Sequence, residues 1–255
     1  YSAPSAYYSP NAARMGGIEI LKGSSQIAHG PHTTGGVVNF LSTGFPTDHS
    51  FYLRSTYGSN SAFDVHSYWS DTSEGDFGKV GILAEIYYRQ TDGFRTIDAG
   101  KGYAGSDETG FDLMEPMVKL FWEPNSDVYQ RFEFKWGTTE FEADETYAGL
   151  TEADIAANPR RRYAGTFLDH MSTEHTRTYL KYLVEPTDNL TIQVAGYYNE
   201  FERDWYKINK AGGQSVSKVV ADPITYSAAY DDLRLLGVGS LGIKHNSRGY
   251  NSKGV

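Results

Sequence analysis

The feature that most constrains the fold of this chain is an alternation of apolar and polar residues that recurs along its length. In residues 79–90, KVGILAEIYYRQ, an extended chain places Val80, Ile82 and Ile86 on one side and Glu85 on the other. The same period of two occurs at 128–137, 175–184 and 190–201, and more weakly at 51–57, 62–70, 110–122 and 235–245. The pattern predicts a mainly β protein with these eight segments as strands.

The connections between these segments are of two kinds. Short links rich in Pro, Asp and Gly occur at 70–78, 123–127 and 185–189, whereas long polar loops occupy 91–109, 139–174 and 203–234. Loops of that length usually carry function. Short turns at one end and long loops at the other are typical of an outer-membrane β-barrel, and strands of about 9–11 residues fit its tilted crossing of the bilayer.

Composition excludes several classes of protein. No window approaches the roughly 18–20 consecutive apolar residues of a transmembrane helix. The net charge of −9 argues against nucleic-acid binding, and the basic run at 160–162 is too short to reverse that. The chain has no cysteine, and its histidines lack metal-ligand spacing, so we expect no metal site. We also see no catalytic arrangement and expect neither an enzyme nor a cofactor.

Residues 1–50 do not share the ten-residue repeat. IEILKG at 18–23 reads as a strand, SSQIAHG at 24–30 as a short turn or helix, and GGVVNFLS at 35–42 as a second strand entered through glycines. The sequence therefore predicts a small α/β unit over 1–47 and a larger strand-rich unit over 48–255.

Residues 7–43, YYSPNAARMGGIEILKGSSQIAHGPHTTGGVVNFLST, resemble the end of the plug domain of TonB-dependent outer-membrane receptors. The matching positions are Ile18, Glu19, Ile20, Leu21, Lys22, Gly23, Gly30, Pro31, Gly35, Gly36, Val37, Val38 and Asn39. RQTDGFR at 89–95 looks like the end of a barrel strand in this family, and 144–165 is similar to a loop of its ferric-citrate and siderophore branch.

The resemblance implies that 1–47 is the C-terminal part of a plug. Residues 48–255 would then be the N-terminal part of a transmembrane β-barrel, about eight strands of about 22. The chain would be a fragment, and the missing N-terminal segment would contact the TonB complex. The implied function is TonB-energised uptake of an iron chelate, ferric citrate or a siderophore, across the bacterial outer membrane, with lipid around the barrel.

Arginines in the long loops are the candidate ligand contacts. Ferric chelates with carboxylate ligands are anionic, and a guanidinium group binds a carboxylate through two parallel hydrogen bonds. The candidates are Arg95, Arg160, Arg161, Arg162 and Tyr163. The alternative for each is a solvated loop residue balanced by neighbouring acidic side chains.

The resemblance also implies contacts between plug and barrel. Matching charged plug positions in the family pair with the barrel wall, which makes Glu19 and Lys22 candidates, although a surface ion pair is an equal alternative. Gly30, Gly35 and Gly36 are expected to give the plug turn its backbone freedom.

Two other functions remain open at this point. A passive porin-like channel has similar strands but no plug. A soluble β-sandwich binding module also alternates along its strands, but it would use the apolar faces as its core and place polar residues outward.

Overall fold

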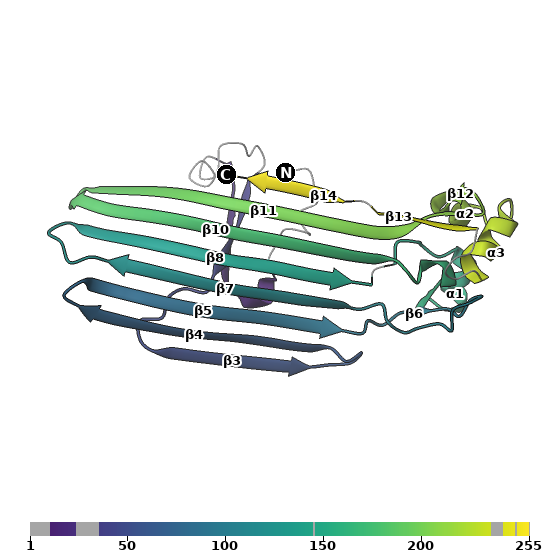
Figure 1. Ribbon diagram of the computed structural model, residues 1–255, viewed down its shortest axis with the longest axis horizontal. Coiled ribbons are helices and arrows are strands. Elements are labelled where there is room, and N and C mark those ends of the chain that lie inside the picture. The colour runs from purple at the N-terminus through teal and green to yellow at the C-terminus, as the bar shows by residue number, and fades with distance from the viewer. Residues whose placement is uncertain (1–10, 24–35, 145, 236–241, 248, 255) are drawn as a thin grey trace.

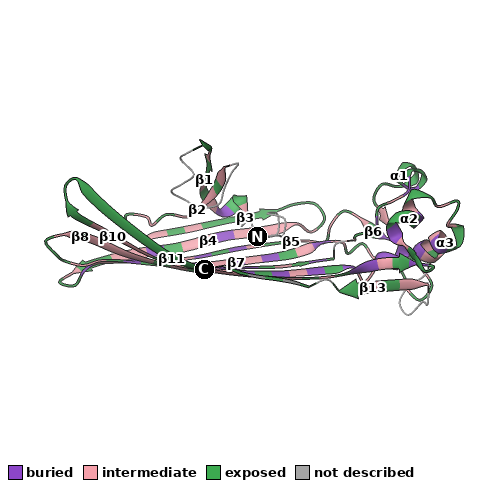
Figure 2. Ribbon diagram, turned by 90° about the horizontal axis from the view of Figure 1, so that it is seen from above, coloured by how far each residue is buried: buried purple, intermediate pink, exposed green. Residues whose placement is uncertain are grey.

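The computed structural model describes residues 11–23, 36–144, 146–235, 242–247 and 249–254. These residues form one large antiparallel sheet, a small hairpin on one face of it, and a lobe of helices and loops at one end (Figure 1). The sheet is gently curved, and the hairpin stands on its concave side (Figure 2).

Seven long strands make up most of the sheet, each antiparallel to the one before it. They are β3 (Ser50–Tyr57), β4 (Phe63–Gly75), β5 (Gly78–Thr91), β7 (Phe111–Glu123), β8 (Tyr129–Ala143), β10 (His170–Thr187) and β11 (Leu190–Ala211). Two short strands, β13 (Ile243–Ser247) and β14 (Tyr250–Gly254), pair with successive parts of β11. The prediction of a mainly β, antiparallel protein is confirmed.

The alternation located seven of its eight segments correctly. In the eighth, 235–245, residues 236–241 lie outside the described residues, Leu235 ends helix α3 (Ser227–Leu235), and 243–245 belong to β13. The strands also run longer than expected: β11 has 22 residues, and β10 has 18. The halves of β10 and β11 that lie farther from the short turn joining them carry polar residues on both faces. The apolar alternation therefore marks only part of each strand.

The two ends of the sheet differ as predicted. Tight turns at 76–77, 124–128 and 188–189 lie at one end, and the long connections gather at the other (Figure 1). The long connections fold into the outer lobe, which contains β6 (Thr96–Ile97), α1 (Glu152–Ala157), β9 (Arg161–Arg162), η4 (Ala164–Thr166), β12 (Gln214–Ser215), α2 (Val216–Ala221) and α3. Tyr163, Ile208, Val219 and Leu233 are completely buried in its core.

The small hairpin consists of a 3-10 turn, η2 (Ala12–Arg14), and two antiparallel strands, β1 (Met15–Leu21) and β2 (Val37–Ser42). The two strands predicted in this segment are confirmed. Gly36 has a φ of +135°, and a Cβ there would lie 2.8 Å from the Leu21 carbonyl oxygen, so this position favours glycine. The predicted turn glycines Gly30 and Gly35 lie outside the described residues.

Candidate functional site

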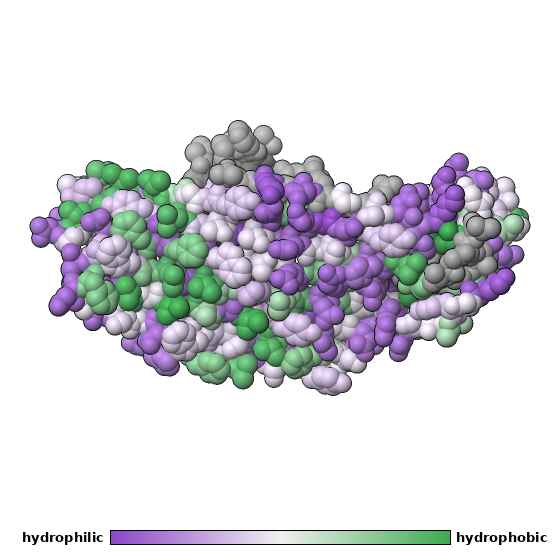
Figure 3. Space-filling model, viewed as in Figure 1, coloured by the Kyte–Doolittle hydropathy of each residue, from purple (hydrophilic) through white to green (hydrophobic). Residues whose placement is uncertain are grey.

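The convex face of the large sheet carries an apolar band. The cross-strand register places side chains of β3, β4, β5, β7, β8, β10 and β11 side by side on this face. The exposed members are Phe51, Leu53, Trp69, Ile86, Leu120, Trp122, Phe134, Trp136, Leu180, Ile192, Val194 and Tyr198. Figure 3 shows hydrophobic side chains gathered over the part of this face nearer the short turns. Among the described residues, no second layer covers the band.

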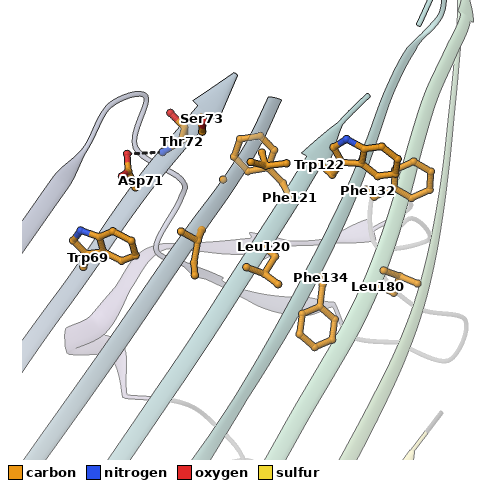
Figure 4. Close-up of a pocket in the computed structure, with 13 residues that line it drawn as sticks. Trp69, Asp71, Thr72, Ser73, Leu120, Phe121, Trp122, Phe132, Phe134 and Leu180 are labelled. Atoms are coloured by element: carbon orange, nitrogen blue, oxygen red, sulfur yellow. Dashed lines mark hydrogen bonds between the residues drawn. The ribbon is translucent and has the colours of Figure 1, made fainter. Parts of the chain in front are cut away.

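The band contains a groove of about 510 Å³ that runs across β4, β5, β7, β8 and β10 (Figure 4). Its apolar walls are Trp69, Val80, Ile82, Leu120, Trp122, Phe132, Phe134 and Leu180. The rings of Trp122 and Phe132 stack at 5.5 Å, and the indole nitrogen of Trp122 donates to the Phe77 carbonyl. Trp122 is thus anchored beside a short turn with its ring on the convex face.

Polar residues limit the band on the side of the outer lobe. On β11, the convex-face positions Leu190, Ile192, Val194 and Tyr198 are followed by Glu200 and further acidic residues. On β8 and β10, Glu140 and Glu174 continue this acidic row. The apolar part of β11 is therefore about ten residues long, the length that a tilted strand needs to cross a hydrocarbon layer.

The concave face has the opposite character, because it buries charged groups beneath the hairpin. Arg14 is 4% exposed, and its Nε lies 2.7 Å from Oε2 of Glu115 on β7. Its Nη1 lies 3.7 Å from Oε2 of Glu85 on β5, and the other oxygen of that carboxylate, Oε1, accepts from Thr43 Oγ1. The imidazole of His66 on β4 lies 2.7 Å from Glu85 Oε1. One arginine of the hairpin thus meets two buried carboxylates on adjacent strands.

Two lysines of the sheet hold the end of β2. Lys119 Nζ donates to the Thr43 carbonyl at 2.7 Å, and Lys135 Nζ donates to Ser42 Oγ at 3.1 Å. Together with the carboxylates around Arg14, these contacts attach both ends of the hairpin to the polar face of the sheet. The hairpin is therefore docked through polar and ionic contacts.

The sequence had suggested Glu19 and Lys22, and not Arg14, for the contact between the hairpin and the sheet. Glu19 is exposed, and its carboxylate accepts a hydrogen bond from Asn39 on the facing strand of the hairpin. Lys22 is exposed at the end of β1. Arg14 makes the buried contact instead, because η2 places it against the sheet. The sequence signal for this contact was Glu85, a carboxylate on a strand whose neighbouring residues are apolar. Alternation along a strand does not show which distant charge lies opposite that carboxylate.

The outer lobe brings the predicted arginines together. A parallel pair of short strands sets Thr96 beside Arg161 and Ile97 beside Arg162, so Arg95 and the basic run at 160–162 lie on adjacent segments. Burial, and then the nearby charge of Arg95, lower the pKa of Arg162. Two guanidinium groups from different loops are therefore close, and each keeps part of its surface exposed.

Arg161 has a different role, because two carboxylates already accept hydrogen bonds from its guanidinium group. Its guanidinium donates to Asp98 Oδ2 at 2.5 Å and to Asp154 Oδ1 at 2.8 Å, which ties the first long loop to α1. Burial would raise the pKa of Asp154, but hydrogen bonds from Tyr230, Tyr163 and Thr151 and the charge of Arg161 hold it below its usual range. Arg161 is thus a clamp inside the lobe.

Tyr163 does not line the surface, contrary to its selection as a ligand contact. It is 0% exposed, and its hydroxyl donates to Asp154 Oδ2 at 2.7 Å and accepts from the Thr151 amide at 3.0 Å. Burial raises the pKa of Tyr163 well above its ordinary value. Among the selected residues, Arg95, Arg160 and Arg162 therefore remain as exposed or half-exposed cations of the lobe.

Within the described residues, no cluster of His, Asp and Glu has the arrangement of a metal site, and no helix is long and apolar enough to cross a membrane. No protein-family model matches the sequence, and no curated protein matches it.

Proposed function

We propose that this chain is part of a TonB-dependent outer-membrane receptor that binds an iron chelate, ferric citrate or a siderophore, in its outer lobe. The observation that carries the proposal is the polarity of the sheet. Its convex face carries an apolar band, about ten residues long on β11, that is uncovered among the described residues, while its concave face buries charges under the hairpin.

This polarity is difficult to reconcile with a soluble sandwich. Such a fold would need a second sheet packed on the apolar band, and among the described residues none covers it. The concave face instead buries Glu85 and Glu115, both paired with Arg14. In a membrane the same arrangement is favourable, because lipid tails cover the apolar face and the hairpin covers the polar one.

The docked hairpin also favours a gated receptor over a passive channel. A hairpin on the concave face fills the space that a porin keeps open for solutes. In the proposed receptor, the ionic contacts of Arg14 with Glu85 and Glu115 hold the plug at rest. Pulling by the TonB complex would then have to break a small number of buried polar contacts.

In the proposed receptor, the outer lobe provides the ligand site. Arg95, Arg160 and Arg162 supply positive charge on loops held by a buried core and by the Arg161 clamp. Such pre-organised arginines suit a chelate with several carboxylates, since each guanidinium can bind one of them. The chemistry required is binding and release, with no covalent step.

The test uses the full-length protein that carries this chain, expressed in a bacterium with an outer membrane. We expect it in the outer-membrane fraction, extracted by detergent and not by urea. Purified protein should bind ferric citrate or a ferric siderophore, and the double variant R95Q/R162Q should weaken that binding at least about tenfold. The variant K101Q/K218Q removes the same charge from exposed lobe positions and should bind as the wild type. A protein that is soluble without detergent, or that binds no ferric chelate, would contradict the proposal.

A further inference from the structure

The concave face carries a second group of cations beside the hairpin. Lys119 on β7, Lys135 on β8, and Arg177 and Lys181 on β10 face the same side of the sheet, and we call them the inner cation patch. Lys119 and Lys135 are direct cross-strand partners. The ammonium groups of Lys135 and Lys181 lie 5.5 and 4.6 Å from the centre of the same ring, that of Tyr179.

Within the part of the chain that the structure describes, no salt bridge joins this patch to a carboxylate. Glu85 and Glu115 are occupied by Arg14. Glu133 lies opposite Lys181 in the register, but its carboxylate contacts Arg131 at 3.6 Å and accepts from the Tyr179 hydroxyl. The nearest carboxylates are thus already engaged by other groups.

The hairpin segment does not compensate this charge. Residues 1–47 contain a single acidic residue, Glu19, which is exposed and bonded to Asn39. The described residues of this segment give the patch neutral oxygens, those of Ser42 and Thr43, and the ring of Phe45, 5.3 Å from Lys119 Nζ. Like charges placed opposite one another in a sheet are destabilising, and a buried charge without a counter-charge is costly. The carboxylates near the patch, Glu85, Glu115 and Glu133, are shared with Arg14 and Arg131, so positive charge is in excess there.

The donors that remain are suited to carboxylates. Arg177 Nη2 donates to Thr139 at 2.5 Å, but its buried Nη1 has no hydrogen-bond partner among the described residues. Lys135 and Lys181 are half-buried, so their ammonium groups can be reached from the concave side while solvent screening is reduced. A fork-shaped guanidinium beside several ammonium groups matches an anion with more than one carboxylate.

We propose that the inner cation patch is an anion-binding site for a polycarboxylate, separate from the outer lobe and next to the docked hairpin. The inference deepens the proposed function and rests on it in one respect: the anion is the carboxylate-bearing cargo, bound a second time after it leaves the outer arginines. The site would hold the cargo on the concave face, next to the hairpin, whose displacement would uncover that face.

The experiment measures citrate binding to the full-length protein in detergent at low ionic strength, with iron-free citrate and ferric citrate as separate probes. The wild type should bind two equivalents. K135Q/K181Q should lose one, with at least a tenfold weaker second affinity, and R95Q/R162Q should lose the other. K101Q/K218Q is the charge-matched control and should retain both. Binding of iron-free citrate but not ferric citrate at the patch would assign it to free carboxylates and overturn the cargo role.

Thermal unfolding separates a binding role from a structural one. K181Q removes repulsion and leaves the contact of Lys135 with Ser42 in place, so it should unfold no lower than the wild type without citrate and should reduce the rise that citrate gives the wild type. K181R should keep that rise. A lower midpoint without citrate together with an unchanged citrate response would overturn the proposal. Failure of the proposed function gives a different result. In that case neither citrate probe binds at Arg95 and Arg162, while the patch still binds citrate.

Discussion

The Nε atom of Arg14 lies 2.7 Å from Oε2 of Glu115, although the two residues are 101 positions apart in the chain. The carboxylate also accepts from Thr139 Oγ1 at 2.8 Å and from the backbone amide of Asn11. This buried, hydrogen-bonded pair links the N-terminal hairpin to the large sheet.

The first prediction concerns this pair. Glu115→Gln should release the hairpin by leaving Arg14 without its main counter-charge, and removing one partner of a buried pair costs about 3–5 kcal/mol. Limited proteolysis should then cleave within 11–42 much faster than in the wild type. Glu140→Gln is the control, because it makes the same change at an exposed carboxylate on the convex face, away from the hairpin, and should matter little. Equal protease resistance of E115Q and wild type would show that other contacts hold the hairpin.

A second prediction tests the apolar band. Phe134→Lys places a charge in the middle of the band on β8 and should cost about 2–4 kcal/mol of folding free energy in a bilayer. Glu140→Lys is the matched control, because it lies on the same strand and face but in the acidic row, where the cost should be at most about 1 kcal/mol. The measurement is denaturant unfolding of the full-length protein in lipid vesicles. Similar effects of the two variants would argue against a lipid-facing band.

The clamp in the outer lobe gives a third prediction. Arg161→Met removes charged hydrogen bonds to Asp98 and Asp154 and should destabilise the lobe by about 1.5–3 kcal/mol. Hydrogen exchange of the amides around 144–169 should speed up accordingly, while exchange in β5 and β7 stays unchanged. Arg160→Met, at an exposed neighbouring position, should change exchange by less than about 0.5 kcal/mol. If both variants behave alike, the two loops are held together by their apolar core.

The fourth prediction is a dependence of stability on pH. Asp169 accepts from the Tyr147 and Ile208 amides, and burial raises its pKa to about 7 despite these bonds and the charge of Lys207. A carboxyl whose pKa is higher in the folded state binds more protons there than when unfolded. Its contribution to stability is therefore greatest at low pH and is lost as the pH rises from about 4 to about 7.

Asp169→Asn tests this directly, because the amide does not titrate. Thermal unfolding in detergent at several pH values should show a smaller decline from pH 4 to pH 7 in the variant. Burial lowers the pKa of His245, 3.6 Å from Asp169. Burial would also lower the pKa of His170, but hydrogen bonds to Asp144 and Glu142 outweigh it and raise that pKa. Because these histidines add their own pH dependence, the comparison is the difference between wild type and D169N. Parallel pH profiles would show that Asp169 does not set the dependence.

Strand positions could be read from the residues because alternation is a local property. Each side chain in an extended chain points opposite to its neighbours, so Val80, Ile82 and Ile86 had to share a face wherever the strand was placed. The same reasoning located the hairpin strands and separated short turns from long loops. It was less exact at 235–245, where, among the described residues, Leu235 still belongs to α3 and the strand begins only at Ile243.

Contacts between distant segments could not be read in this way. The pairing of Arg14 with Glu115 depends on where the hairpin docks, and the burial of Tyr163 depends on how two long connections pack with the end of β11. Both are set by the packing of segments far apart in the chain, which leaves no local pattern. The alternation supplied the strands and their two faces, and the three-dimensional packing selected which charges meet and which arginines stay exposed.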